Sequence, residues 1–431
     1  KRIDGVTEDP SLTIEKALSL NLDPLKYGTI VEIGAGQEVS RWFFQAGAAA
    51  GTIAKSMSAY DMKFSDEIYG VAADQRYVSR SRLESMLEHE FDLIVSRISE
   101  QRPDSSRFFA FANTVTAQGF KKRADCHGWL GIRLQLTPKS PPDEIILHVR
   151  MLDETNLDQQ EALGILGVNL IYGAYHYHDN PEKLLKSLVE NLRWGRIEID
   201  LIEMHGPTLG AIDDRLMALE LVKADLSRAV LFNLDGKVVI PADTFYRKRV
   251  LAMRGKFYAV EQGDIDLFMH AKSRFQKESK ASDSEVLSLT ELTMAQMAND
   301  KSIDTSDFLA RANRLSDAGF HVLISGFFRH FRVSQYLSGN TREPVAIVTG
   351  VEGLGDIFRE DYYDGLTGGI LEGLGQMFPP STVVYVYPTI SDTSIASYED
   401  LPVDDHLKPL LTYLHDRNQI MFIDDYESLP T

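Results

Sequence analysis

The clearest pattern along the chain is an amphipathic helix over 81–98. Apolar residues recur there at every third or fourth position and fall on one helical face, and they are Leu83, Leu87, Phe91, Ile94 and Ile98. Ser81 with Glu84 three residues later forms a capping box that marks the helix start. Similar patterns predict further helices over 156–172, 306–318 and 404–415, and one that begins at Asn180-Pro181.

Short runs rich in β-branched and aromatic residues alternate with these helices and predict strands. The runs cover 108–115, 129–136, 144–151, 197–204, 322–325, 345–349, 382–387 and 420–423. An Asp235-Gly236 turn between two further apolar runs predicts a β-hairpin.

Beyond residue 286 the strands are apolar throughout, which is typical of strands covered on both faces. Their alternation with helices implies a parallel sheet with right-handed crossovers. We therefore expect an α/β protein with a mixed α/β (α+β) domain over 1–285 and a Rossmann-like three-layer domain over 286–431. The polar, charged segment 276–285 is the predicted linker.

Composition narrows the class of protein. The chain has 431 residues and a formal net charge of -18, so its surface repels nucleic-acid phosphates and anionic membranes. One cysteine, Cys126, permits no intrachain disulfide and fits a reducing compartment. No apolar run approaches the ~20 residues of a membrane span. We expect a cytoplasmic protein with neither nucleic acid nor membrane as partner, and homo-oligomerisation is left open.

A strand, glycine turn and helix start are predicted around Glu32-Ile-Gly34-Ala-Gly36. The segment resembles the glycine turn of S-adenosylmethionine-dependent methyltransferases. That resemblance implies a cofactor loop, with Asp61 as the carboxylate that binds ribose hydroxyls. Lys55 could neutralise a phosphate there. The alternative is a structural turn that lets a helix pack close to a strand, with Lys55 on the surface.

A second candidate site lies at the rim of the C-terminal sheet, because ligands of open parallel sheets lie beyond the carboxyl ends of the strands. Ser325 and Arg329 follow one predicted strand, and Gly353 follows the next. The glycine allows close backbone approach, and the arginine could grip a phosphate or carboxylate. The alternative is that the arginine pairs with acidic neighbours and the glycine only forms a turn.

Histidines suggest a third kind of site. His176 and His178 precede a helix cap, and His205 ends a strand two residues after Glu203. Zinc or iron would accept two histidines and a carboxylate. The alternative is a set of loop and interface histidines without a metal.

Across most of its length the chain is similar to a poorly characterised bacterial family whose members are sometimes called nicotinate-nucleotide adenylyltransferases. The resemblance rests on Val31–Glu38, Ser58–Asp61 and Gly368–Glu372. It implies a bacterial, cytoplasmic protein. The His-x-Gly-His motif of nucleotidyltransferases is absent from the sequence, so no catalytic residue is carried over.

Two hypotheses for function follow. The first is binding of a small anionic or nucleotide-like ligand, with a transferase as one form of it. Glu32 and His205 are then the candidates for a general base, and the sequence names no catalytic residue and no cofactor. The second is a non-catalytic assembly or scaffold protein.

Overall fold

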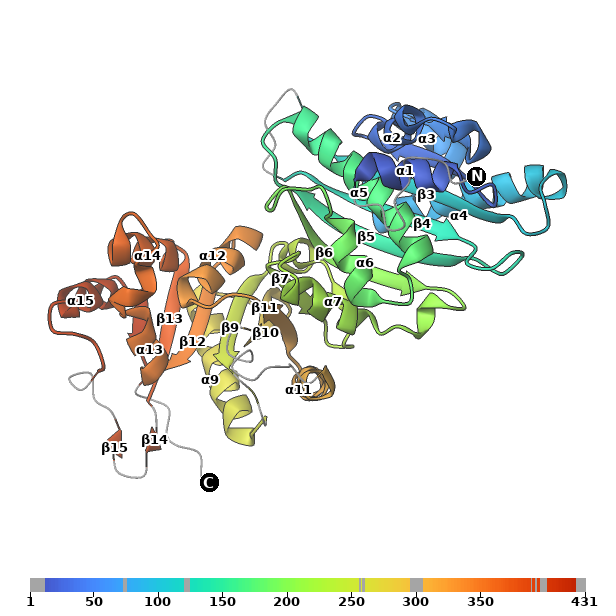
Figure 1. Cartoon of the computed structure of the whole chain (residues 1–431). Helices are drawn as coiled ribbons and strands as arrows, with labels where there is room; N and C mark the ends of the chain where they lie inside the picture. The colour runs from blue at the N-terminus through green and yellow to red at the C-terminus, as the bar shows by residue number, and fades with distance from the viewer. Residues whose placement is uncertain are drawn as a thin grey trace. The chain divides into compact units, whose positions relative to one another are not determined.

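The chain forms two compact units, Lys1–Ser227 (unit 1) and Arg228–Thr431 (unit 2). They are shown in Figure 1, a computed structural model. The described residues are 12–72, 76–119, 125–255, 257, 260–294, 305–388, 390–391, 394–395 and 401–423.

Unit 1 is built on a six-stranded sheet with the order β2-β1-β3-β4-β5-β6. β1 pairs in parallel with β2 and with β3, and the pairs from β3 to β6 are antiparallel. The strands are β1 (Lys26–Ile33), β2 (Ile53–Met57), β3 (Arg107–Thr116), β4 (His127–Leu134), β5 (Asp143–Met151) and β6 (Ile197–His205).

Helices cover both faces of this sheet. The main core of unit 1 joins one face to α1, α2, α5, α6 and α7. On the other face α4 packs Phe91 and Ile94 against Phe108 and Ala110 of β3. The helices are α1 (Thr13–Asn21), α2 (Glu38–Ala46), α3 (Met62–Tyr69), α4 (Arg80–Ile98), α5 (Asn156–His176), α6 (Pro181–Leu188) and α7 (Asp214–Lys223).

Unit 2 contains an eight-stranded sheet with the order β16-β13-β12-β9-β10-β11-β7-β8. The strands from β16 to β11 pair in parallel, and the β7–β8 hairpin joins β11 antiparallel. The strands are β7 (Ala229–Phe232), β8 (Val238–Val239), β9 (Arg249–Gly255), β10 (Val286–Thr293), β11 (His321–Ser325), β12 (Val345–Gly350), β13 (Thr382–Tyr387) and β16 (Ile420–Phe422), besides a separate pair, β14 (Ile390–Ser391) and β15 (Ser394–Ile395).

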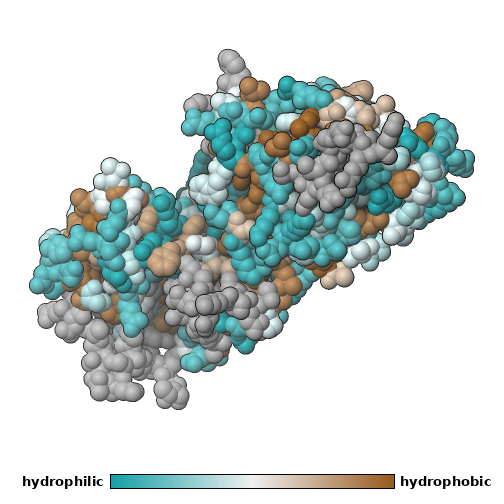
Figure 2. Space-filling model, viewed as in Figure 1, coloured by the Kyte–Doolittle hydropathy of each residue, from teal (hydrophilic) through white to brown (hydrophobic). Residues whose placement is uncertain are grey.

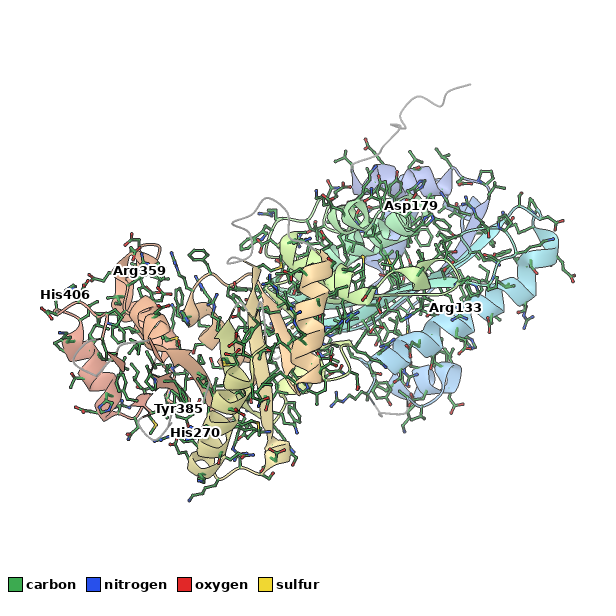
Figure 3. The ribbon with its side chains drawn as sticks, turned by 90° about the horizontal axis from the view of Figure 1, so that it is seen from below. Arg133, Asp179, His270, Arg359, Tyr385 and His406 are labelled. Carbon is green, nitrogen blue, oxygen red and sulfur yellow. The ribbon has the colours of Figure 1, made fainter. Side chains whose placement is uncertain are left out.

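Two helical layers enclose the sheet of unit 2. α12 to α15 share one apolar core with the sheet, and α9 and α11 pack on the opposite face, where Phe275 of α9 meets Tyr385. His270 of α9 bonds to Tyr387 of β13, and Figure 3 shows His270 near Tyr385. The helices are α8 (Pro241–Phe245), α9 (Gln262–Ser279), α11 (Thr305–Asp317), α12 (His330–Asn340), α13 (Val351–Ile357), α14 (Gly369–Met377) and α15 (Lys408–Asp416).

The α/β class and the Rossmann-like sheet are confirmed. The boundary between the two units, however, lies earlier in the chain than the predicted boundary at 285 and 286. β9 lies between β10 and β12 in the sheet, so residues 229–255 belong to unit 2, and the boundary along the chain falls between Ser227 and Arg228. The segment 276–285, predicted as a linker, contains the end of α9 and a 3-10 turn. The side chain of Ser79, rather than that of Ser81, caps α4 by accepting from the Arg82 N–H.

On the face shown in Figure 2, hydrophilic residues predominate and apolar ones are scattered between them. Within the described ranges, every helix is too short or too polar to serve as a transmembrane span.

The position of β9 predicts which fragments of the chain can fold. A fragment 228–431 keeps every strand of the unit 2 sheet and should unfold cooperatively. A fragment 286–431 loses the strand that joins β10 to β12, and should show neither a cooperative thermal transition by circular dichroism nor dispersed amide signals by NMR. Cooperative unfolding of the shorter fragment would contradict this topology.

Candidate functional site

The parallel strands of unit 2 follow the doubly wound order. Counted along the chain from β9, their order across the sheet is 6-5-4-1-2-3, so the chain reverses direction between β9 and β12. In open α/β sheets, ligands bind beyond the carboxyl ends of the strands at such a switch point. The groups at the ends of β9, β10, β11 and β12 therefore form the candidate site.

A buried ion pair lies at these strand ends. The Arg254 side chain of β9 is 6% exposed and that of Glu291 of β10 is 0% exposed, and Arg254 Nε lies 3.2 Å from Glu291 Oε2. Ser325, the last residue of β11, donates from its hydroxyl to the other carboxylate oxygen. Burial raises the pKa of Glu291, which the charge of Arg254 and the Ser325 hydrogen bond oppose.

The same network fixes the loop that leads from β11 into α12. The Phe327 carbonyl accepts from the Arg254 guanidinium and, at 2.8 Å, from the Thr293 hydroxyl. The Phe327 N–H donates to Ser325 Oγ at 3.1 Å. Three neighbouring strands thus hold this loop at the edge of the sheet.

His330, the first residue of α12, lies close to the end of β12, the next strand along the chain. A Cβ built on Gly353 of α13 would lie 3.7 Å from His330 Nε2 and 2.0 Å from Thr349 Oγ1 at the end of β12. Burial and the nearby charge of Arg254 lower the pKa of His330 to about 3, so the ring is neutral at pH 7. The predicted segments at Ser325, Arg329 and Gly353 do therefore meet.

Arg329 lies between two aromatic rings at the rim of the site. Its guanidinium is 3.3 Å from the Tyr362 ring centroid and 4.1 Å from that of Phe328. Within the described part of the chain, Nη1 of Arg329 and Nη1 of Arg254 are buried and have no hydrogen-bond partner. Arg254 and the segment that follows β11 thus each contribute a guanidinium group with an unpaired nitrogen, and such groups can hold an anion.

In unit 1 the glycine turn is occupied by the chain's own groups. The Glu32 carboxylate accepts from the Val39 and Ser40 N–H groups of the first turn of α2, at 3.0 and 3.1 Å, and also from the Ser40 hydroxyl. These are the donors that a phosphate would use at a helix start. Burial raises the pKa of Glu32 from 4.5 to about 7, against the opposing effect of these hydrogen bonds.

The glycines of this turn have conformational and packing roles. Gly34 has φ 99°, and a Cβ there would lie 2.0 Å from the Val115 carbonyl oxygen. The Gly36 N–H, in a residue with φ 74°, donates to the Tyr60 hydroxyl at 2.6 Å. Asp61 caps α3 by accepting from the Phe64 N–H at 2.8 Å. The contacts match the structural alternative, and a cofactor in this turn stays a prediction.

Lys55 lies on β2 and pairs with Glu90 of α4, whose side chain is 1% exposed, at 2.5 Å. Glu90 also accepts from the Tyr69 hydroxyl at 2.8 Å. The lysine therefore faces α4, whereas the first turn of α2 belongs to the opposite face of the sheet.

The structure does not bring the three histidines together. His176 stacks on Tyr172 and lies 3.2 Å from Lys26 Nζ at the start of β1. His205 ends β6, which three strands separate from β1, and it bonds to Glu203 and to Arg80. Nowhere in the described ranges do three His, Cys, Asp or Glu side chains form a metal-binding group.

Sequence reasoning missed Arg254 and Glu291. Each is a charged residue near the carboxyl end of a largely buried strand, β9 (Arg249–Gly255) and β10 (Val286–Thr293). Charged residues are rarely fully buried unless paired. A charge inside each of two apolar strands was the signal that could have identified this pair.

No protein-family model matches the chain, and no curated protein matches it. Among solved structures it is similar to the competence/damage inducible protein CihA from Agrobacterium tumefaciens, with a TM-score of 0.28 and 14% identity, over 38% of this chain and 97% of that chain. A CinA superfamily protein from Enterobacter cloacae gives the same TM-score and identity, over 41% and 99%. Similarity at this level identifies neither a family nor an activity, and it neither supports nor contradicts the adenylyltransferase name.

The raised pKa of Glu32 predicts a pH dependence of stability. A carboxyl whose folded pKa lies above its unfolded value favours folding below the unfolded pKa, and this stability is lost as pH rises through the folded pKa. From pH 4.5 to about 7, the free energy of unfolding of the wild type should fall by up to about 3 kcal/mol relative to Glu32→Gln. Denaturant titrations at several pH values measure this difference. A difference that is constant with pH, or that grows in the other direction, would contradict it.

The buried Arg254–Glu291 pair predicts that the effects of mutating its two members on the free energy of unfolding are not additive. Glu291→Ala leaves the Arg254 charge buried and unpaired, and should cost about 3–5 kcal/mol of unfolding free energy. The double variant Arg254→Met/Glu291→Leu removes both charges and should recover most of that loss. Chemical denaturation of both variants tests this, and equal losses in the two would exclude the uncompensated charge as the cause.

Proposed function

We propose that unit 2 binds a small anionic, nucleotide-like ligand at the carboxyl ends of β9, β10, β11 and β12. The proposal is supported most by Arg254, whose buried Nη1 has no hydrogen-bond partner within the described residues. Buried polar groups in proteins are nearly always paired, so a buried guanidinium nitrogen without a partner at a switch point favours a missing anion.

The rim of this site suits a planar group attached to the anion. The Phe328 side chain is 59% exposed although it is aromatic, and it lies beside Arg329 and Tyr362. A nucleobase could stack on such a surface while its phosphate reaches Arg254. These rings favour a nucleotide over a simple inorganic anion.

The side chains at this site are better suited to binding a ligand than to catalysing a reaction. His330, with a pKa of about 3, is a poor general base at neutral pH. Glu291 is fully buried and already bonded to Arg254 and Ser325. We therefore propose ligand binding as the function, and a transferase reaction stays a prediction.

A thermal-shift experiment with pyrophosphate and with ADP tests the proposal. At a hundred times its dissociation constant, a ligand of the folded state adds about 2.7 kcal/mol to the free energy of unfolding. The wild type should show this increase. Arg254→Met/Glu291→Leu should lose it, because the cation is gone although the fold is kept.

The chain offers a matched control on the same strand. Arg249 at the start of β9 pairs with Glu285 at 3.4 Å, at the opposite end of the sheet from the site. Arg249→Met/Glu285→Leu should keep the ligand-induced shift. No shift in the wild type, or an equal shift in all three proteins, would overturn the proposal, and no shift would favour the scaffold hypothesis.

A further inference from the structure

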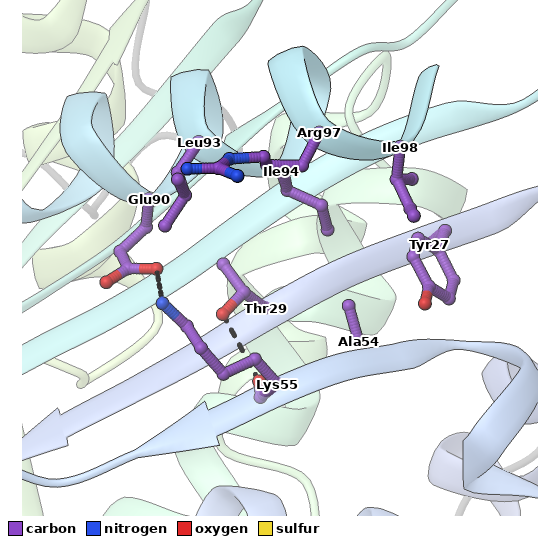
Figure 4. Close-up of a pocket in the computed structure, with 9 residues that line it drawn as sticks. All are labelled: Tyr27, Thr29, Ala54, Lys55, Glu90, Leu93, Ile94, Arg97 and Ile98. Carbon is purple, nitrogen blue, oxygen red and sulfur yellow. Dashed lines mark hydrogen bonds and ion pairs between the residues drawn. The ribbon is translucent and has the colours of Figure 1, made fainter. Parts of the chain in front are cut away.

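A cavity lies in unit 1, between α4 and the strands β1 and β2 (Figure 4). Its volume is about 230 Å³, and the residues that line it are Tyr27, Thr29, Ala54, Lys55, Glu90, Leu93, Ile94, Arg97 and Ile98. Pockets for drug-sized ligands span ~300–1,000 Å³, so this one suits a smaller molecule. β2 is the edge strand of the sheet, which leaves the pocket accessible from that side.

The walls of this pocket are mainly apolar. Leu93, Ile94 and Ile98 extend from α4, and Ala54 lies on β2. The Thr29 hydroxyl is already used, since it donates to the Lys55 carbonyl at 3.2 Å. A ligand body between these walls must therefore be apolar.

One end of the pocket is charged. Figure 4 shows Lys55 and Glu90 together at this end. The Glu90 carboxylate neutralises the lysine, but an ammonium group has three N–H donors and the 2.5 Å contact with Glu90 uses one of them. Lys55 can thus donate to a ligand without adding net charge.

Arg97 supplies the excess positive charge. It lies about two helical turns beyond Glu90 on α4, and Figure 4 shows its guanidinium extending toward the Lys55 end of the pocket. Arg97 is exposed, and no ion pair or hydrogen bond of its side chain occurs among the described residues. A guanidinium without a carboxylate partner beside an apolar cavity is suited to a single acidic group.

The other end of the pocket is aromatic and apolar, formed by Tyr27 and Ile98 (Figure 4). The guanidinium of Arg102 stacks on the Tyr27 ring at 3.5 Å from its centroid and holds the ring in place. The cavity therefore has a cationic end and an aromatic end, joined by aliphatic walls.

We propose that this pocket binds a small monocarboxylic acid with a compact apolar body. The carboxylate would lie between Arg97 and Lys55, and the body would extend along Ile94 toward Tyr27. Among the residues that line the pocket, Lys55, Glu90 and Arg97 leave one excess positive charge, which matches one carboxylate, whereas a phosphate ester brings about two negative charges next to Glu90. This site is on unit 1 and is independent of the function proposed for unit 2.

Binding of 2-naphthoate, followed by its fluorescence or by calorimetry, tests the proposal on the full chain. The wild type should bind 2-naphthoate and bind the uncharged 2-naphthamide at least about tenfold more weakly. Arg97→Ala should weaken 2-naphthoate binding by about tenfold or more, since it removes the charge-assisted hydrogen bonds. Ala54→Trp, at an exposed strand position, should fill the cavity and abolish binding.

Arg193→Ala is the matched control, because Arg193 is also exposed and its side chain makes no ion pair or hydrogen bond in the described part of unit 1. That variant should bind like the wild type. The proposal is overturned by no binding of 2-naphthoate at millimolar concentration, by unchanged binding in Arg97→Ala or Ala54→Trp, or by an equal loss in Arg193→Ala. Arg254→Met/Glu291→Leu should bind 2-naphthoate normally, so failure here and failure of the unit 2 site are distinguishable.

Discussion

The buried contact between Arg254 and Glu291 is the constraint on which the carboxyl edge of the unit 2 sheet depends. Removing two charges from water is expensive, and apolar side chains of similar size would often stabilise the fold as well or better. Two further hydrogen bonds stabilise the pair: the Ser325 hydroxyl donates to Glu291, and the Phe327 carbonyl accepts from Arg254. Stability alone does not account for charges at this place, whereas the ligand binding that we propose would account for them.

The two units differ in how the polar groups at the switch point of their sheets are paired. In unit 1, β1 lies between β2 and β3, so the chain also reverses there. Its glycine turn is nevertheless filled, because Glu32 satisfies the start of α2 and Tyr60 takes the Gly36 N–H. In unit 2 the corresponding edge contains guanidinium nitrogens that the described residues leave unpaired. We therefore place the proposed ligand at the switch point of unit 2, where the described residues leave guanidinium nitrogens without acceptors.

Much of the fold could be predicted from local patterns. The strand at 382–387 and the hairpin around Asp235-Gly236 are confirmed, and so is the buried face of α4. Strand order could not be predicted, because nothing local shows that β9 inserts between β10 and β12. The domain boundary depended on that order. Likewise, sequence cannot distinguish Glu32 as a helix cap from Glu32 as a ligand contact, since both need a carboxylate beside a glycine turn.

Of the predicted site residues, Ser325, Arg329 and Gly353 lie at the same carboxyl edge of the sheet because β11 and β12 run in the same direction, although β9 and β10 separate these two strands. Arg254 and Glu291 complete the site only through pairing between strands, which the sequence does not show. The most direct measurement is the side-chain Nε–H NMR signal of Arg254 during titration with ADP, assigned by its loss in Arg254→Met/Glu291→Leu. A ligand at the unit 2 site should produce a saturable shift of this signal while that of Arg249 stays constant. An Arg254 signal that does not change, or that shifts only as the surface arginines do with added salt, would contradict it.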